Sequence, residues 1–258
     1  MDYVRPVDFS KFRPTDFHSQ FIGDDSSGVH SATLICTRVP PGKGTPSLHV
    51  HTGDQFYYIL KGEMNVHLGE YQLQAGPGDL VFLPQAVPHR NWNSTDEEEV
   101  HFELIAPGVP PGLARSYRVA TPDPNVQLKP RVDPNYVRHI DTSKFNPDSF
   151  STVVMADRTT GSNHCRLNLV RVPPGKGGPA LHVHTFDQYY YVLSGTMQLQ
   201  IGRERCAAGP NTYVILPAGV PHANWNEGAE PETHIAILVP EYLPGAKADI
   251  PVLLDGAG

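Results

Sequence analysis

The chain has 258 residues, enough for one large domain or two of ordinary size, and either would bury a real core. Its net charge of −7 comes without any basic run, which argues against nucleic-acid binding as the main role. Charged residues make up only 18%, and 26 prolines and 23 glycines favour short strands joined by turns over long helices.

Signals for secretion and for membrane insertion are missing. The first residues, MDYVRPVDFSKF, lack the apolar core of a signal peptide, and no segment approaches the roughly 18 apolar residues of a membrane span. The 3 cysteines are scattered without CxxC spacing, which predicts reduced thiols and no disulfide framework. We therefore expect a cytoplasmic protein that contacts neither membrane nor nucleic acid.

The sequence is an internal duplication with a constant offset of 133 residues. RVPPGKGTPSLHVHTGDQFYYILKG, at 38–62, returns as RVPPGKGGPALHVHTFDQYYYVLSG, at 171–195, with 19 identities in 25 positions. A period this long is too great for a solenoid and fits two tandem domains. We place them at residues 1–125 and 126–258.

Within each copy, apolar runs of about 5 to 9 residues alternate with glycine and proline, as is typical of strands. Closely spaced strands with turn punctuation indicate a sandwich or a barrel, so we expect an all-β protein. In the first copy the expected strands lie, in chain order, within 28–39, 48–52, 55–69, 71–76, 79–84 and 99–107.

A set of histidines recurs in both copies. His49 and His51 are one residue apart on an expected strand, so their side chains point to the same face. A lone histidine on a strand is usually a packed residue, but two on one face, joined by a third and by an oxygen donor, could surround a divalent transition metal. The two predicted sets are His49, His51, Gln55 and His89, and His182, His184, Gln188 and His222.

These residues fall into two motifs, HxH-x3-Q-x6-G and P-x-[AG]-x-P-H-x3-N, and each motif occurs twice. The motif pair resembles that of the cupin superfamily, and the resemblance covers both halves. It implies a bicupin, two tandem jelly-roll-like β-barrels in one chain. Motif positions include Gly44, Gly62, Gly78, Pro84 and Asn93, then Gly177, Gly195, Pro217, Gly219 and Asn226.

The resemblance specifies the fold better than the reaction, because cupins include dioxygenases, decarboxylases, isomerases, lyases, sugar binders and storage proteins. Three-histidine cupins similar to this one are often Fe(II) dioxygenases that cleave β-diketones or hydroxylated aromatics. Flavonol (quercetin) 2,3-dioxygenases are bicupins with a similar layout. The resemblance therefore implies a metal-dependent dioxygenase with Fe(II), or alternatively Mn, Ni, Co or Cu, and homodimers are common in the family.

Two other classes stay open. One is a non-redox metal-dependent lyase or isomerase, and the other is a non-catalytic bicupin that binds a small molecule. Oxygen consumption separates the first class from a dioxygenase. A binding or storage protein predicts barrels without metal, or a metal site that is closed to ligands.

Gln55 and Gln188 stand where cupins of this pattern usually carry glutamate. A neutral amide leaves the full +2 charge on the metal, which favours an anionic or enolisable substrate that binds together with O₂. An amide cannot act as a general base. Three interpretations remain: a fourth ligand, a hydrogen-bond partner outside the coordination shell, or a half that has lost its metal.

Other residues on the same faces are further catalytic candidates. Tyr57 and Tyr190 either touch substrate or fill the barrel, and His101 and His234 could accept protons if they face inward. Glu103 shares the face of His101, but its counterpart is Ala236, so it could distinguish the two halves. The acidic run 96–99 (DEEE) predicts a solvated loop.

Overall fold

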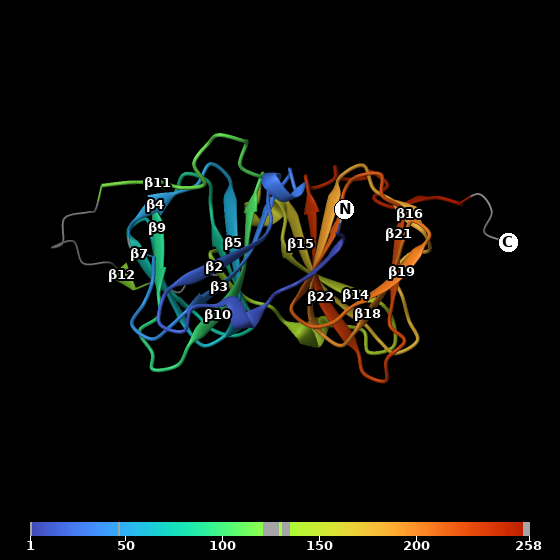
Figure 1. Ribbon diagram of the computed structural model, residues 1–258, viewed down its shortest axis with the longest axis horizontal. Coiled ribbons are helices and arrows are strands. Elements are labelled where there is room, and N and C mark those ends of the chain that lie inside the picture. Colours follow the sequence, from blue (N-terminus) through green and yellow to red (C-terminus); the bar gives the residue numbers. More distant parts are fainter. Residues whose placement is uncertain (1, 46, 121–128, 131–134, 255–258) are drawn as a thin grey trace. The chain divides into compact units, whose positions relative to one another are not determined.

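The structure, a computed structural model, describes residues 2–45, 47–120, 129–130 and 135–254. Nearly all of its regular structure is β-strand, which confirms the all-β prediction (Figure 1). The helical segments described are single 3₁₀ turns, and none has the length and apolar character needed to cross a membrane. These turns are η1 (Phe9–Lys11), η2 (Asp25–Ser27), η3 (Thr142–Lys144) and η4 (Arg158–Thr160).

The first compact unit, here the N-terminal barrel, comprises Asp8–Ile140 and Thr160–His164. Its first sheet has the order β13-β8-β5-β10-β3-β2 and its second the order β11-β4-β9-β6-β7-β12. The strands are β2 (His18–Gly23), β3 (Thr33–Val39), β4 (His49–Val50), β5 (Asp54–Lys61), β6 (Met64–Leu68), β7 (Tyr71–Ala75), β8 (Asp79–Leu83), β9 (His89–Trp92), β10 (Glu99–Ala106), β11 (Tyr117–Arg118), β12 (Lys129–Pro130) and β13 (Val137–His139).

The second unit, here the C-terminal barrel, comprises the chain up to Val7, Asp141–Thr159 and the chain from Cys165 onward. Its sheets have the orders β1-β20-β17-β22-β15-β14 and β19-β18-β21-β16-β23. The strands are β1 (Val4–Pro6), β14 (Ser151–Ala156), β15 (Arg166–Val172), β16 (His182–Val183), β17 (Asp187–Ser194), β18 (Met197–Ile201), β19 (Glu204–Ala208), β20 (Thr212–Leu216), β21 (His222–Trp225), β22 (Glu232–Val239) and β23 (Ile250–Pro251).

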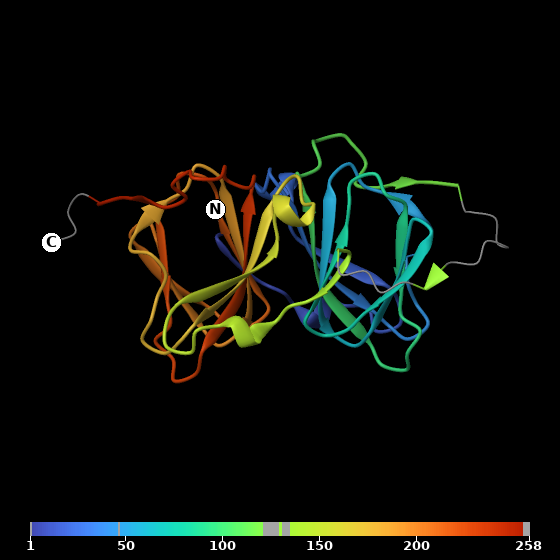
Figure 2. The ribbon, with the colours of Figure 1, turned by 180° about the vertical axis from the view of Figure 1, so that it is seen from behind.

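One strand of each sequence copy belongs to the barrel of the other copy (Figures 1 and 2). Strand β1 pairs with β20, Val4 opposite Val214, and β13 pairs with β8, Val137 opposite Val81. The two pairings occupy equivalent positions in the duplicated sequence. The predicted boundary at residues 125 and 126 lies outside the described residues, and it stays a prediction, as does the homodimer.

The polar site and the apolar core of each barrel share the inward faces of the strands, so that in β5 Gln55 of the site is followed on the same face by residues of the core. In β5 the core cluster includes Tyr57 and Ile59, packed against residues such as Val66 and Leu83 from the surrounding strands. Gly44 allows the segment before β4 to cross β9, because a Cβ there would lie 2.4 Å from the Asn91 carbonyl oxygen. These contacts bring β4 and β9 together with His49 opposite His89.

Candidate metal centres

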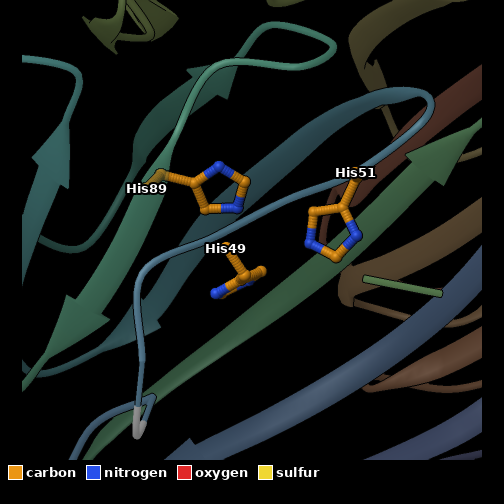
Figure 3. Close-up of side chains that lie close together, drawn as sticks. All are labelled: His49, His51 and His89. Atoms are coloured by element: carbon orange, nitrogen blue, oxygen red, sulfur yellow. The ribbon is translucent and has the colours of Figure 1, made fainter. Parts of the chain in front are cut away.

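Three histidines converge in the N-terminal barrel (Figure 3). His49 lies in β4, His51 follows that strand, and His89 begins β9, and their ligand atoms all lie within 4.8 Å of one another. Each Nδ1 donates to a backbone carbonyl, so each Nε2 keeps its lone pair for a metal. The acceptors are the carbonyl oxygens of Ser47 (3.0 Å), Arg115 (2.6 Å) and Val87 (2.9 Å).

Burial keeps two of these imidazoles, His51 and His89, in the neutral form that binds metal. Burial, with the nearby His49, lowers the pKa of His89 to about 3, and burial lowers the pKa of His51. The Nε2 atoms of His51 and His89 are buried and have no hydrogen-bond partner in the part of the chain that the structure describes. Buried polar atoms are rarely left unpaired, and neutral imidazole nitrogens that face one another are suitable ligands for a divalent cation.

The C-terminal barrel repeats this arrangement with His182, His184 and His222, whose ligand atoms also lie within 4.8 Å of one another. Their Nδ1 atoms again donate to carbonyl oxygens, and burial lowers the pKa of His222 to about 3 and that of His182 below its usual value. The structure therefore brings together the predicted histidines of both sets. The carbonyl acceptors belong to Ala180 (2.7 Å), Ala248 (2.8 Å) and Val220 (3.0 Å).

Gln188 brings its amide oxygen against this second set of nitrogens. Its Oε1 lies 2.8 Å from His222 Nε2 and 3.0 Å from His184 Nε2, and the Tyr190 hydroxyl donates to the same oxygen at 3.0 Å. Because both imidazoles already donate through Nδ1, these approaches join acceptor to acceptor. A cation among the three atoms would relieve the repulsion, so the donor set fits a metal with Gln188 beside it.

Gln55 is held differently. Its Nε2 donates to Glu103 Oε1 at 2.5 Å, and its Oε1 is buried without a partner among the described residues. The Glu103 carboxylate thus fixes which end of the amide is free. The counterpart of Glu103 on β22 is Ala236, opposite Tyr190, so this contact exists only in the N-terminal barrel.

Glu103 belongs to a buried chain of ionisable groups. Its Oε2 accepts from Thr37 Oγ1 at 3.2 Å and lies 3.8 Å from His101 Nε2, while His101 Nδ1 contacts Glu99 at 2.9 Å. Burial alone would raise the pKa of Glu103, but His101, with smaller contributions from His51 and Gln55, holds it below the usual value. Tyr57 lies 4.6 Å from the His101 ring, centroid to centroid. The sequence candidates Tyr57, His101 and Glu103 therefore meet at one place.

The prediction of a solvated loop over residues 96–99 is wrong for its last member. Glu99 begins β10 and is fully buried, because His101, two residues along the same strand face, compensates its charge. Glu232 and His234 repeat this pair at 2.9 Å in the C-terminal barrel. The recurrence of glutamate two residues before each of these histidines was the available signal.

A cavity of about 140 Å³ opens beside the N-terminal centre. Phe21, Ile35 and Ile105 give it apolar walls, and Asn91 faces it with both amide atoms buried and unpartnered among the described residues. Arg115 also lines it, pairs with Asp24 and lies over the Phe21 ring at 4.2 Å. Asn91 and Arg115 are not among the candidates from the sequence, although Asn91 recurs as Asn224 two residues after the motif histidine, whereas Arg115 has no charged counterpart in the second copy.

Comparison with known proteins assigns the family. The model of the cupin domain matches residues 36–106 and again residues 168–238. The chain belongs to the cupin family. Because the domain occurs twice, this protein is a bicupin, as the motifs predicted.

Solved structures with the same fold include oxalate decarboxylase from Bacillus subtilis. The structure of that enzyme at pH 4.6 matches this chain with a TM-score of 0.66 and 17% sequence identity. The match covers 91% of this chain and 75% of the enzyme. A form of the enzyme with several substitutions matches with a TM-score of 0.70 and 17% sequence identity, and this match covers 95% of this chain and 78% of the enzyme. No match is found among curated protein sequences. At this identity the likeness shows the shared fold.

Changing Gln55 to glutamate will raise the metal affinity of the N-terminal centre and lower its affinity for an anionic substrate, because the carboxylate reduces the charge of the centre. In this variant a second carboxylate lies beside Glu103, where the wild type has the amide NH₂ of Gln55 as a hydrogen-bond donor. We therefore expect the free energy of unfolding of the metal-free protein to fall by about 1–3 kcal/mol. Gln188→Glu is the matched control, because Ala236 stands at the position of Glu103 in the C-terminal barrel and brings no second carboxylate there. Titration of metal and urea unfolding of both variants measure the two effects. Unchanged affinities would place Gln55 away from the metal.

The free energy of unfolding of the metal-free protein will fall as the pH rises from about 6.5 to 9. Burial opposes the charged form of His101, but Glu99 and Glu103 outweigh it and raise its pKa to about 9. Since the folded pKa exceeds the unfolded value, this stabilisation is complete below pH 6.5 and disappears through pH 9, amounting to roughly a few kcal/mol. Urea unfolding across this range will show a steeper fall for the wild type than for His101→Gln combined with Glu99→Gln. Equal slopes would contradict the assignment.

Proposed function

We propose that this bicupin is a metal-dependent dioxygenase acting on a small, enolisable, anionic substrate such as a short β-diketone. A metal held by the three histidines would supply the positive charge that binds the enolate and the place where O₂ reacts with it. The observation that carries the proposal is the N-terminal centre, where neutral imidazole nitrogens, the free oxygen of Gln55 and the carboxylate of Glu103 border one cavity.

The size of that cavity narrows the substrate class. Pockets for drug-sized ligands measure about 300–1,000 Å³. At about 140 Å³ the cavity beside His49 and His51 suits a substrate of a few heavy atoms better than a flavonol. The proposal therefore favours β-diketones and small oxo or hydroxy acids among the substrates that the family resemblance implied.

The residues around the cavity have distinct roles in this proposal. Glu103 accepts the proton that the substrate loses on forming its enolate, a role closed to the amide of Gln55. His101 lies 3.8 Å from Glu103 and stabilises its charge. The unpartnered amide of Asn91 hydrogen-bonds a substrate oxygen, and the Arg115 guanidinium provides a cation at the wall.

Oxygen uptake tests the reaction. Protein reconstituted anaerobically with Fe(II), and in parallel with Mn, Ni, Co or Cu, is mixed with short β-diketones, hydroxybenzoates and a flavonol. We expect one O₂ consumed for each β-diketone lost and little turnover of the flavonol. Substrate loss without O₂ consumption would overturn the dioxygenase assignment.

The chain of carboxylates and imidazole also supports a second candidate, a non-redox lyase. The chain could deliver a proton to the carbanion that loss of CO₂ leaves, through Glu103, His101 and Glu99. This reaction consumes no oxidant. The solved structures that share this fold include those of an oxalate decarboxylase. Release of CO₂ from oxalate or a small oxo acid, without O₂ consumption, would favour this candidate.

A further inference from the structure

Besides Glu103, whose counterpart is Ala236, the two centres differ in charge at a second equivalent position. Strand β11 pairs with β4 and β23 pairs with β16 in matching registers, Tyr117 opposite Val50 and Ile250 opposite Val183. The residue just before each strand is therefore equivalent. It is Ser116 in the N-terminal barrel, where it lines the cavity, and Asp249 in the C-terminal barrel.

The Asp249 carboxylate faces the second centre. Its Oδ1 lies 3.7 Å from His182 Nε2, the nitrogen that the Nδ1–carbonyl hydrogen bond leaves free for a metal. Donor atoms about 2.1 Å from one ion are separated by roughly 3.0 Å at right angles and about 4.2 Å when opposite. The separation from His182 lies within that range, but Oδ1 is also 3.7 Å from His184 Nδ1, and Asp249 lies outside the group of three histidines whose ligand atoms are all within 4.8 Å of one another, so its side chain must turn to reach the metal. The side chain is 45% exposed, so it is not locked in place by packing.

Another difference between the two centres lies beside His184. Phe186 stacks on the His184 ring, with the centroids 4.6 Å apart and the planes 12° apart, and it is almost fully buried. Its counterpart in the N-terminal barrel is Gly53, which has no side chain. An aromatic ring thus packs against a ligand of the second centre where the first centre has none.

We propose that Asp249 is a carboxylate ligand of the C-terminal metal centre, brought by strand β23, and that its charge makes this centre hold metal more tightly and exclude anions. Asp249 thereby takes the role of the carboxylate that this family usually carries in the first motif. The N-terminal centre has the uncharged Ser116 at the equivalent wall, and His101 compensates the carboxylate of Glu103, so this centre stays open to an anionic substrate. The inference depends on the metal site of the proposed function, but not on its reaction.

Metal affinity of each isolated centre tests this inference without any turnover. In a His49→Ala background only the C-terminal centre binds, and Co²⁺ or Mn²⁺ is titrated in competition with a chelator. Asp249→Asn should weaken binding by about tenfold or more and change the Co²⁺ visible spectrum. The matched Ser116→Ala change, in a His182→Ala background, should leave the affinity of the N-terminal centre within about twofold.

An anionic probe gives the second readout. Malonate should perturb the Co²⁺ spectrum of the N-terminal centre and leave that of the C-terminal centre unchanged until Asp249 is changed to asparagine. An Asp249→Asn variant with unaltered metal affinity and spectrum would overturn the inference, as would malonate binding at a wild-type C-terminal centre. Failure of O₂ uptake would affect the proposed reaction alone, because these titrations need no substrate.

Discussion

On the proposed dioxygenase reaction, changing His49 to alanine will remove one of two metal ions from each chain and lower O₂ consumption by at least about a thousandfold, because the metal would supply both charge and oxygen chemistry. The matched His182→Ala change will remove the other ion and spare most turnover, since the cavity proposed to hold the substrate lies beside the N-terminal centre. Elemental analysis and O₂ uptake of the two variants measure this difference.

Folding must be checked in both variants, because His182 is buried whereas His49 is partly exposed. Circular dichroism and thermal unfolding of the metal-free proteins serve as the control. Equal loss of turnover in two well-folded variants would contradict the assignment of catalysis to one centre. Retention of both metal ions by His49→Ala would contradict the metal site itself.

In the proposed reaction Glu103 accepts the substrate proton, so changing it to glutamine will lower kcat by about a hundred- to a thousandfold while the metal content stays near that of the wild type, because an amide cannot accept that proton. Gln55 loses a carboxylate acceptor but keeps an amide oxygen as partner. Steady-state kinetics with parallel elemental analysis separate the two effects. Supplying the enolate directly, by raising the pH above the substrate's own pKa, should restore part of the lost rate.

Two outcomes would count against this role of Glu103. One is a variant with unchanged kcat, and the other is a fall in rate that follows metal loss in proportion. Ala236→Glu is the reciprocal control, since it places a carboxylate at the equivalent position of the C-terminal barrel. We expect it to add no turnover, because Asp249 and Phe186 lie against that centre.

The histidine sets were predictable because their geometry depends on local rules. Alternation along a strand puts His49 and His51 on one face, and the duplication repeats the pattern in His182 and His184, so two sites followed from the sequence. His101 and Glu103 could be placed on one strand face by the same rule. The contacts of Glu103 with Gln55 and Thr37 could not be predicted, because they depend on the register between neighbouring strands.

Other features depend on pairings between distant segments. Asp249 reaches the second centre only because β23, a strand of two residues with no apolar period, pairs with β16. The exchange of β1 and β13 between the barrels is likewise invisible, because three-residue edge strands carry little periodicity. Glu99 was misjudged since its acidic neighbours suggested solvent, whereas a buried partner on the same strand face compensates its charge.

The measurement that tests the central claim most directly is the metal content of the full chain after anaerobic reconstitution and removal of loose metal. Two three-histidine centres predict about two divalent ions per chain, with nitrogen ligands detectable by X-ray absorption or electron paramagnetic resonance. A content below about 0.2 ions per chain, or a bound metal without imidazole ligands, would contradict the account.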